Sequence, residues 1–242
     1  EITLECNPED ITEEYVRWII DLWINRISLG VQTLNNISLS EIHRSDRESI
    51  IAALTTIEKA KNDKDLSVNI DFILGLPYVK SGEILENIRE LHRRFPHICH
   101  TSVYMLEDEK YPKHWKENSI TTDELQKEFL DILDYFESIG WNHYELSNFA
   151  RPWAKSIHNQ SYWNHSNYRG FGLSASSFED GKRSTNSSSF SWYYLGKKED
   201  EEILTADQRE IEKMMFGLRT DGIEYCPEVK SFFRHSEVRG IQ

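Results

Sequence analysis

Short apolar runs typical of β-strands alternate with longer segments whose apolar residues recur at helical spacing. In residues 2–6 every second side chain is apolar, which predicts a strand. After Thr12 the apolar residues recur three and four positions apart, which predicts an amphipathic helix. Strands are predicted at residues 2–6, 26–31, 69–74, 101–106 and 141–146, and helices are predicted to follow Thr12, Ser45, Ser81 and Thr121.

Capping residues mark several of the predicted helix boundaries. Thr121 with Glu124 has the spacing of a capping box, in which hydroxyl and carboxylate bind backbone N–H groups of the first turn. Ser45 with Glu48 has the same spacing. Gly140 is placed to end the helix after Thr121, because glycine readily adopts the left-handed conformation of a helix end.

The order of these elements predicts a fold class. Strands and helices alternate with short connections, which is typical of βαβ units and a parallel sheet, either closed into a barrel or open. In both arrangements functional groups collect at the carboxyl ends of the strands.

The composition changes after Arg151 and Pro152. Residues 152–197 are rich in Ser, Asn, Trp, Tyr and His, which predicts irregular structure packed on the sheet or lining a pocket. The charged run at residues 197–202 is interpreted as a solvated turn. Thr205 with Gln208 opens a last predicted helix that extends to about Leu218.

Charge and cysteine content exclude several classes of function. The chain of 242 residues carries 28 basic and 41 acidic side chains, a net charge of −13, which argues against nucleic acid as a partner. No apolar run approaches the roughly 18 residues of a transmembrane segment. Cys6, Cys99 and Cys226 are far apart, so they form neither a C-x-x-C pair nor a disulfide framework. A chain that opens on Glu1 inside a strand suggests a fragment, in which an upstream targeting signal could not be recognised.

Four polar side chains stand out near the predicted strand ends: Glu5, Gln32, Arg44 and Asp71. Two carboxylates, an amide and a guanidinium suit a small zwitterionic ligand, since Arg can bind a carboxylate through two hydrogen bonds and the acids can accept from an ammonium or a ribose. The alternative is structural. In that case Asp71 and Arg44 form a buried ion pair, and the other two residues cap loops.

Seven segments, in this order, resemble one protein family. The resemblance is to the oxygen-independent coproporphyrinogen III oxidase-like family of radical S-adenosylmethionine (SAM) proteins. The H-N-x-x-Y-W element at residues 158–163 resembles the sequences of the family's haem-chaperone branch rather than those of its coproporphyrinogen dehydrogenases. The segments are ECNP (5–8), RISLGVQT (26–33), NIDFILGLP (69–77), YELSNFAR (144–151), HNQSYW (158–163), YRGFGLSAS (168–176) and GLRTDGI (217–223).

The resemblance implies a fold and a SAM site. Residues 1–150 would form a partial TIM-like (β/α)6 radical SAM barrel from its third strand onward. Residues 151–242 would form a haem- or substrate-side segment and the start of an α-rich C-terminal region. In the family, positions that match Glu5, Gln32, Arg44 and Asp71 contact SAM, with Arg44 on the methionine carboxylate.

The resemblance also implies haem binding by the later segment. His158 would be a haem-iron ligand and Asn159, Tyr162 and Trp163 its neighbours, because imidazole is a common axial ligand and flat aromatic rings pack on a porphyrin. The structural alternative is a hydrogen-bonded His158 in an aromatic core.

The family's [4Fe–4S] cluster needs a C-x-x-x-C-x-x-C triplet, which this sequence lacks, so metal ligands for the cluster are expected only in an intact parent protein. The resemblance further implies an unknown haem-accepting partner and a cytoplasmic location, or a mitochondrial one in a eukaryote.

Several functions stay open at this point, and so does whether the chain is an enzyme. A coproporphyrinogen III dehydrogenase would convert propionate side chains to vinyl groups. A barrel that never used a cluster would bind a small zwitterion. A degenerate fragment would bind no haem.

Overall fold

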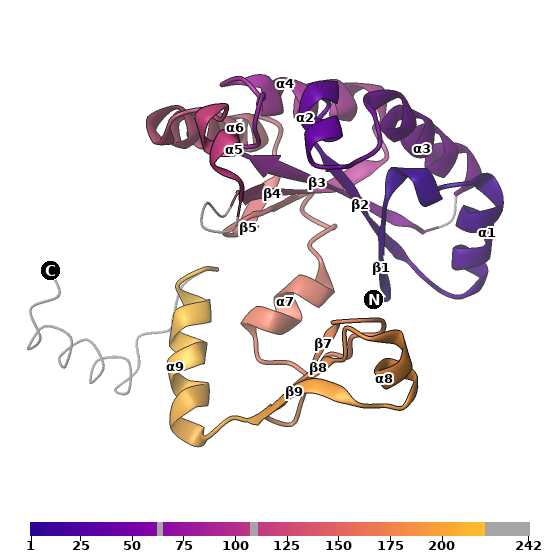
Figure 1. The fold of residues 1–242 in the computed structure, drawn as a ribbon, viewed down its shortest axis with the longest axis vertical. Coiled ribbons are helices and arrows are strands. Elements are labelled where there is room, and N and C mark those ends of the chain that lie inside the picture. The colour runs from indigo at the N-terminus through magenta and orange to yellow at the C-terminus, as the bar shows by residue number, and fades with distance from the viewer. Residues whose placement is uncertain (62–64, 107–110, 221–242) are drawn as a thin grey trace, which may run out of the picture. The chain divides into compact units, whose positions relative to one another are not determined.

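The structure is a computed structural model that describes residues 1–61, 65–106 and 111–220 (Figure 1). The chain divides into two compact units, Glu1–Ser156 and Ile157–Gln242. None of the helices in the described ranges is both long and apolar enough to cross a membrane.

The first unit is built on a mixed sheet of six strands in the order β1-β2-β3-β4-β6-β5. The first four strands are parallel, and β6 is antiparallel to both β4 and β5. The predicted α/β class is therefore confirmed, with a mixed rather than a purely parallel sheet. The strands are β1 (Thr3–Cys6), β2 (Arg26–Gln32), β3 (Ser67–Leu74), β4 (Ile98–Met105), β5 (Asn142–Glu145) and β6 (Asn148–Ala150).

Helices of this unit lie along one side of the sheet (Figure 1). They cover the apolar side chains of the strands, among them Ile27, Ile70 and Phe72, which are all fully buried. The helical elements are η1 (Pro8–Asp10), α1 (Glu13–Asp21), α2 (Asn36–Glu41), α3 (Arg47–Ala60), α4 (Glu83–Arg94), α5 (Lys113–Glu117) and α6 (Thr122–Ser138).

Helix starts follow the local hydrogen-bonding chemistry. Thr121 and Glu124 form the predicted capping box of α6, and Gly140 follows that helix with a φ of 72°. The capping box predicted at Ser45 is wrong. Asp46 caps α3 instead, because its carboxylate accepts from the backbone N–H of Ser49 at 2.9 Å.

The end of the first unit differs from its prediction. The segment predicted as one strand at residues 141–146 is the first half of a tight hairpin, and β6 turns back to pair with β4. The sequence does not reveal this reversal, because the turn at Leu146 and Ser147 contains neither glycine nor proline, the residues that usually mark a tight turn.

The second unit contains a three-stranded antiparallel sheet, β7-β8-β9, which the sequence did not predict. The irregular structure predicted for residues 152–197 is therefore wrong, and so is the turn predicted at 197–202, because most of that charged run lies in β9. Exposed charges are compatible with an edge strand, which pairs through its backbone. The elements are α7 (Ile157–Trp163), β7 (Ser176–Glu179), β8 (Lys182–Asn186), α8 (Phe190–Tyr194), β9 (Lys198–Ile203) and α9 (Ala206–Gly217). Thr205 and Gln208 form the predicted capping box of α9.

Candidate functional site

The sheet of the first unit has one polar face. Side chains alternate between faces along each strand, and the parallel register aligns the polar ones across neighbouring strands. One row crosses the sheet, and a second row follows it one step nearer the carboxyl ends of the strands. The first row is Glu5, Ser28, Asn69 and His100, and the second contains Gly30, Asp71 and Ser102.

Asp71 is held by its neighbours on this face. The hydroxyl of Ser28 donates to one carboxylate oxygen at 2.8 Å, and the amide of Asn69 donates to the other at 2.8 Å. The Asn69 amide also donates to the Ser28 oxygen at 2.7 Å. These bonds fix the carboxylate in one orientation, and they explain how an apolar strand accommodates an acid.

Asn69 connects Asp71 to a buried histidine. His100 is completely buried, and its Nδ1 lies 2.6 Å from the side-chain oxygen of Asn69. Since that oxygen can only accept, Nδ1 carries the proton, and Nε2 accepts from the hydroxyl of Tyr144 at 2.6 Å. Burial, reinforced by the charge of Arg26, holds the pKa of His100 well below its usual 6.5. His100 is therefore a neutral link in an ordered network.

Gln32 lies at the end of β2, where it pairs with Phe72, the residue after Asp71. A bulge separates Gly30 and Gln32, and Gln32 adopts a left-handed backbone conformation with a φ of 65°. A Cβ atom on Gly30 would lie only 2.9 Å from the amide nitrogen of Gln32. The missing side chain of Gly30 thus leaves room for the Gln32 amide to fold back next to the Asp71 row.

Glu5 and Arg44 complete the predicted set at the carboxyl end of β1. Glu5 is exposed and lies opposite Ser28, the partner of Asp71. The guanidinium of Arg44 donates to the side-chain oxygen of Asn7, two residues after Glu5. Arg44 does not form the ion pair with Asp71 that was the structural alternative: its guanidinium is bonded to Asn7, and the Asp71 carboxylate is bonded to Ser28 and Asn69.

The sequence did not single out the residues that hold this set together. Asn69, His100 and Tyr144 come from three different strands, and only the register brings them into contact. A partial signal was available, since polar residues recur at alternate positions of β4, at His100, Ser102 and Tyr104.

Of the two described cysteines, Cys99 lies close to the polar face, with its sulfur 3.1 Å from the hydroxyl of Ser67, two residues before Asn69 in β3. Cys6 and Cys99 are buried free thiols, and burial raises the pKa of Cys6 to about 11. Cys226 lies outside the described residues. Among residues 1–61, 65–106 and 111–220, no three His, Cys, Asp or Glu side chains are grouped so that they could hold a metal ion.

In the second unit the predicted haem residues lie on α7. The Nε2 atom of His158 is 2.6 Å from the hydroxyl of Tyr162, one helical turn further along. The ring of Tyr162 meets the ring of Tyr168 edge-on at 4.5 Å, and the Tyr168 backbone pairs with that of Phe178 in β7. His158 and Tyr162 are both half-buried, so the cluster combines an aromatic wall with partial exposure.

Asn159 and Trp163 occupy the same short helix and are also half-buried. The ring of Trp163 packs edge-on against Phe216 of α9 at 5.4 Å, and its indole nitrogen is buried without a hydrogen-bond partner among the described residues. Arg219 lies over the same ring at 5.8 Å. Trp163 therefore joins α7 to α9.

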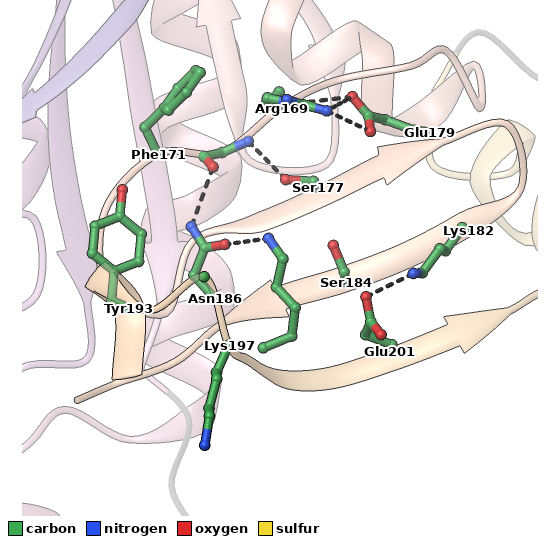
Figure 2. A pocket seen from close by; sticks show the side chains of 13 residues that line it. Arg169, Phe171, Ser177, Glu179, Lys182, Ser184, Asn186, Tyr193, Lys197 and Glu201 are labelled. Atoms are coloured by element: carbon green, nitrogen blue, oxygen red, sulfur yellow. Dashed lines mark hydrogen bonds and ion pairs between the residues drawn. The ribbon is translucent and has the colours of Figure 1, made fainter. Parts of the chain in front are cut away.

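A separate pocket of about 470 Å³ lies on the small sheet (Figure 2). Ser177 and Glu179 line it, so Phe178 between them, together with Tyr168 and the His158 cluster, belongs to the opposite face. Each of the cationic side chains that line the pocket already contacts a protein group. These contacts are Arg169–Glu179, Lys182–Glu201, Lys198–Asn186 and Lys197 over the ring of Trp192.

Comparison with known proteins identifies the family. A scan against family models finds no match. The chain is 32% identical over 232 residues to the haem chaperone HemW of Lactococcus lactis, covering 90% of this chain and 59% of that protein. It is 29% identical over 236 residues to the haem chaperone HemW of Bacillus subtilis, covering 90% of this chain and 60% of that protein. The chain belongs to the haem-chaperone branch of the coproporphyrinogen oxidase-like radical SAM family.

A relative in Bos taurus, the mitochondrial radical S-adenosyl methionine domain-containing protein 1, is 30% identical over 186 residues, which cover 72% of this chain and 40% of the relative. The chain thus spans about 60% of the length of the two bacterial HemW relatives, and less of the mitochondrial one.

The fold is similar to that of coproporphyrinogen III oxidase (HemN) from Escherichia coli, described as a radical SAM enzyme. The TM-score is 0.72 at 19% identity, over 91% of this chain and 55% of that one. At this identity the likeness establishes the fold, which is that of the HemN-like radical SAM proteins.

Proposed function

We propose that the chain is part of a haem chaperone, and that its second unit binds haem as cargo through the imidazole of His158. The observation that carries the proposal is the placement of His158 in a half-buried aromatic cluster with Tyr162 and Tyr168, in a chain similar to named haem chaperones. Imidazole nitrogen binds haem iron, and aromatic faces bury the flat apolar area of a porphyrin. Asn159 and Trp163 would line the same side of the site.

The polar face of the first unit would belong to a radical SAM barrel and contribute contacts to SAM. The donor set fits this ligand. A guanidinium at Arg44 can bind the methionine carboxylate, and carboxylates at Glu5 and Asp71 can accept from its ammonium and ribose hydroxyls. Gly30 leaves space for the Gln32 amide, which offers both a donor and an acceptor.

When bound together, SAM and a [4Fe–4S] cluster supply one-electron chemistry. The residues described above would orient SAM. Ser28 and Asn69 hold the Asp71 carboxylate, which keeps further lone pairs for the ligand. Because these bonds already fix its orientation, Asp71 would not need to reorient when SAM binds. A haem-accepting partner protein and a cytoplasmic or mitochondrial location are further parts of this proposal, and the name of the mitochondrial relative supports the second location.

Titration of the chain with ferric haem tests the proposal. The Soret absorption band should shift and saturate near one equivalent. His158→Ala should weaken binding by at least about tenfold, since it removes the iron ligand, which corresponds to about 1.4 kcal/mol. His114→Ala is the matched control, because His114 is an exposed imidazole in the other unit. Equal affinity of wild type and His158→Ala would contradict the proposal.

A further inference from the structure

The hydrogen bond between His158 and Tyr162 occupies the nitrogen that most often binds haem iron. The distance from Nε2 of His158 to the Tyr162 hydroxyl is 2.6 Å. A ring nitrogen of imidazole has either one lone pair or one proton to offer. Nε2 therefore cannot bind this hydroxyl and iron at the same time, whichever of the two atoms donates.

Tyr162 is held in this position by its own neighbours. Its ring meets that of Tyr168 edge-on at 4.5 Å, and the backbone of Tyr168 exchanges hydrogen bonds of 2.9 Å with Phe178 in both directions. Phe178 is almost fully buried in β7. Both residues are on the seven-residue helix α7, with His158 in its first turn. Through its packing on Tyr168, the ring of Tyr162 also contacts the part of the chain that pairs with the small sheet.

We propose that the hydroxyl of Tyr162 competes with haem iron for Nε2 of His158 and thereby sets the affinity of the site for haem. This inference rests on the proposed function. Competition lowers the affinity for iron by the free energy of one hydrogen bond, and it gives the imidazole a protein partner when the iron leaves. Both effects suit a carrier. A lower affinity allows the haem to be released to a partner, and after release the imidazole of His158 again has a hydrogen-bond partner.

An opposite role would give the opposite result. If iron bound Nδ1 instead, the Tyr162 hydroxyl would orient the ring from behind and increase its basicity, as outer partners of metal-bound histidines do. Removing the hydroxyl would then weaken haem binding. The sign of the change in affinity therefore separates competition from support.

Tyr162→Phe tests the proposal, because it removes the hydroxyl and keeps the ring that packs on Tyr168. In titrations with ferric haem, Tyr162→Phe should bind about five- to tenfold more tightly than wild type, and it should release haem to excess apomyoglobin correspondingly more slowly. In a His158→Ala background the same substitution should change nothing. Unchanged or weaker binding by Tyr162→Phe would overturn the competition.

Tyr193→Phe is the matched control for loss of a phenol hydroxyl from a half-buried tyrosine of the same unit, since the Tyr193 hydroxyl accepts from the backbone N–H of Gly172 and lies outside the His158 cluster. It should leave haem affinity unchanged. A second measurement needs no haem: the nitrogen NMR shift of Nε2 in His158 should move in Tyr162→Phe. If His158→Ala binds haem as wild type does, the proposed function fails. If only Tyr162→Phe has no effect, the competition alone fails.

Discussion

Two histidine–tyrosine pairs of the molecule have the same hydrogen-bond distance and different surroundings. Nε2 of His100 lies 2.6 Å from the hydroxyl of Tyr144 in the first unit, and Nε2 of His158 lies 2.6 Å from that of Tyr162 in the second. His100 is completely buried and its other nitrogen binds Asn69, whereas His158 is half-buried on a short helix.

The difference teaches that a short hydrogen bond does not by itself distinguish a structural histidine from a ligand. Both nitrogens of His100 are used within the sheet, so this ring can only order its neighbours. His158 lies in a half-buried aromatic cluster, and the proposed haem site requires that its bond to one phenol be exchanged for a bond to iron. The predictions below test that contrast through the cost of removing or protonating each ring.

The largest effect is expected for His100→Ala. The substitution removes one hydrogen-bond partner from the Asn69 oxygen and one from the Tyr144 hydroxyl in a dry interior, and it opens a cavity. We expect a loss of about 3 kcal/mol in the free energy of unfolding, measured by urea denaturation. His100→Gln should recover part of the loss, because an amide can donate to Asn69. A loss below about 1 kcal/mol in the free energy of unfolding would mean that His100 contributes no more to stability than is expected of His158.

An intermediate effect is expected from acid, through the partly buried His92. Burial, with a contribution from Arg151, lowers the pKa of His92 to about 3 from the usual 6.5. Between these values the unfolded chain binds a proton that the folded chain does not, so stability falls as the pH decreases, by about 1.4 kcal/mol per pH unit. His100 acts with the same sign.

The dependence on acid can be measured by urea denaturation between about pH 6.5 and 4.5. The variant His92→Gln should show a slope that is shallower by about 1.4 kcal/mol per pH unit. An unchanged slope would mean that the ring of His92 is protonated in the folded chain, against its burial beside Thr101 and Trp141.

The smallest effect on stability is expected for His158→Ala. A half-buried ring that shares a hydrogen bond with one tyrosine contributes about 1 kcal/mol or less to the free energy of unfolding. Thermal unfolding followed by circular dichroism would measure it. A loss as large as that for His100→Ala would indicate that His158 is a core residue and would remove the contrast between the two pairs.

Local chemistry was readable in the sequence, and pairing across the sheet was not. The capping boxes at Thr121 and Thr205 depend on residues three positions apart, so the sequence reveals them directly. The charged run in β9 pairs with β8 through backbone hydrogen bonds, which leave no signal in the side chains. Its composition alone therefore favoured a turn.

The same division applies to the candidate site. Residue chemistry and a family resemblance pointed to Asp71 and His158, and their roles as SAM and haem contacts stay predictions. The network around Asp71 could not be found from the sequence, because Ser28 and Asn69, which hold the carboxylate, and His100, which holds Asn69, are brought together only by the register of β2, β3 and β4.

The most direct measurement compares the haem affinities of two variants, each lacking one ring of the two pairs. Both His158→Ala and His100→Gln are titrated with ferric haem beside the wild-type chain, after circular dichroism has established that each is folded. The account predicts that His158→Ala loses at least about tenfold in affinity while His100→Gln stays within about twofold of wild type. Loss of binding in His100→Gln with normal binding in His158→Ala would contradict it.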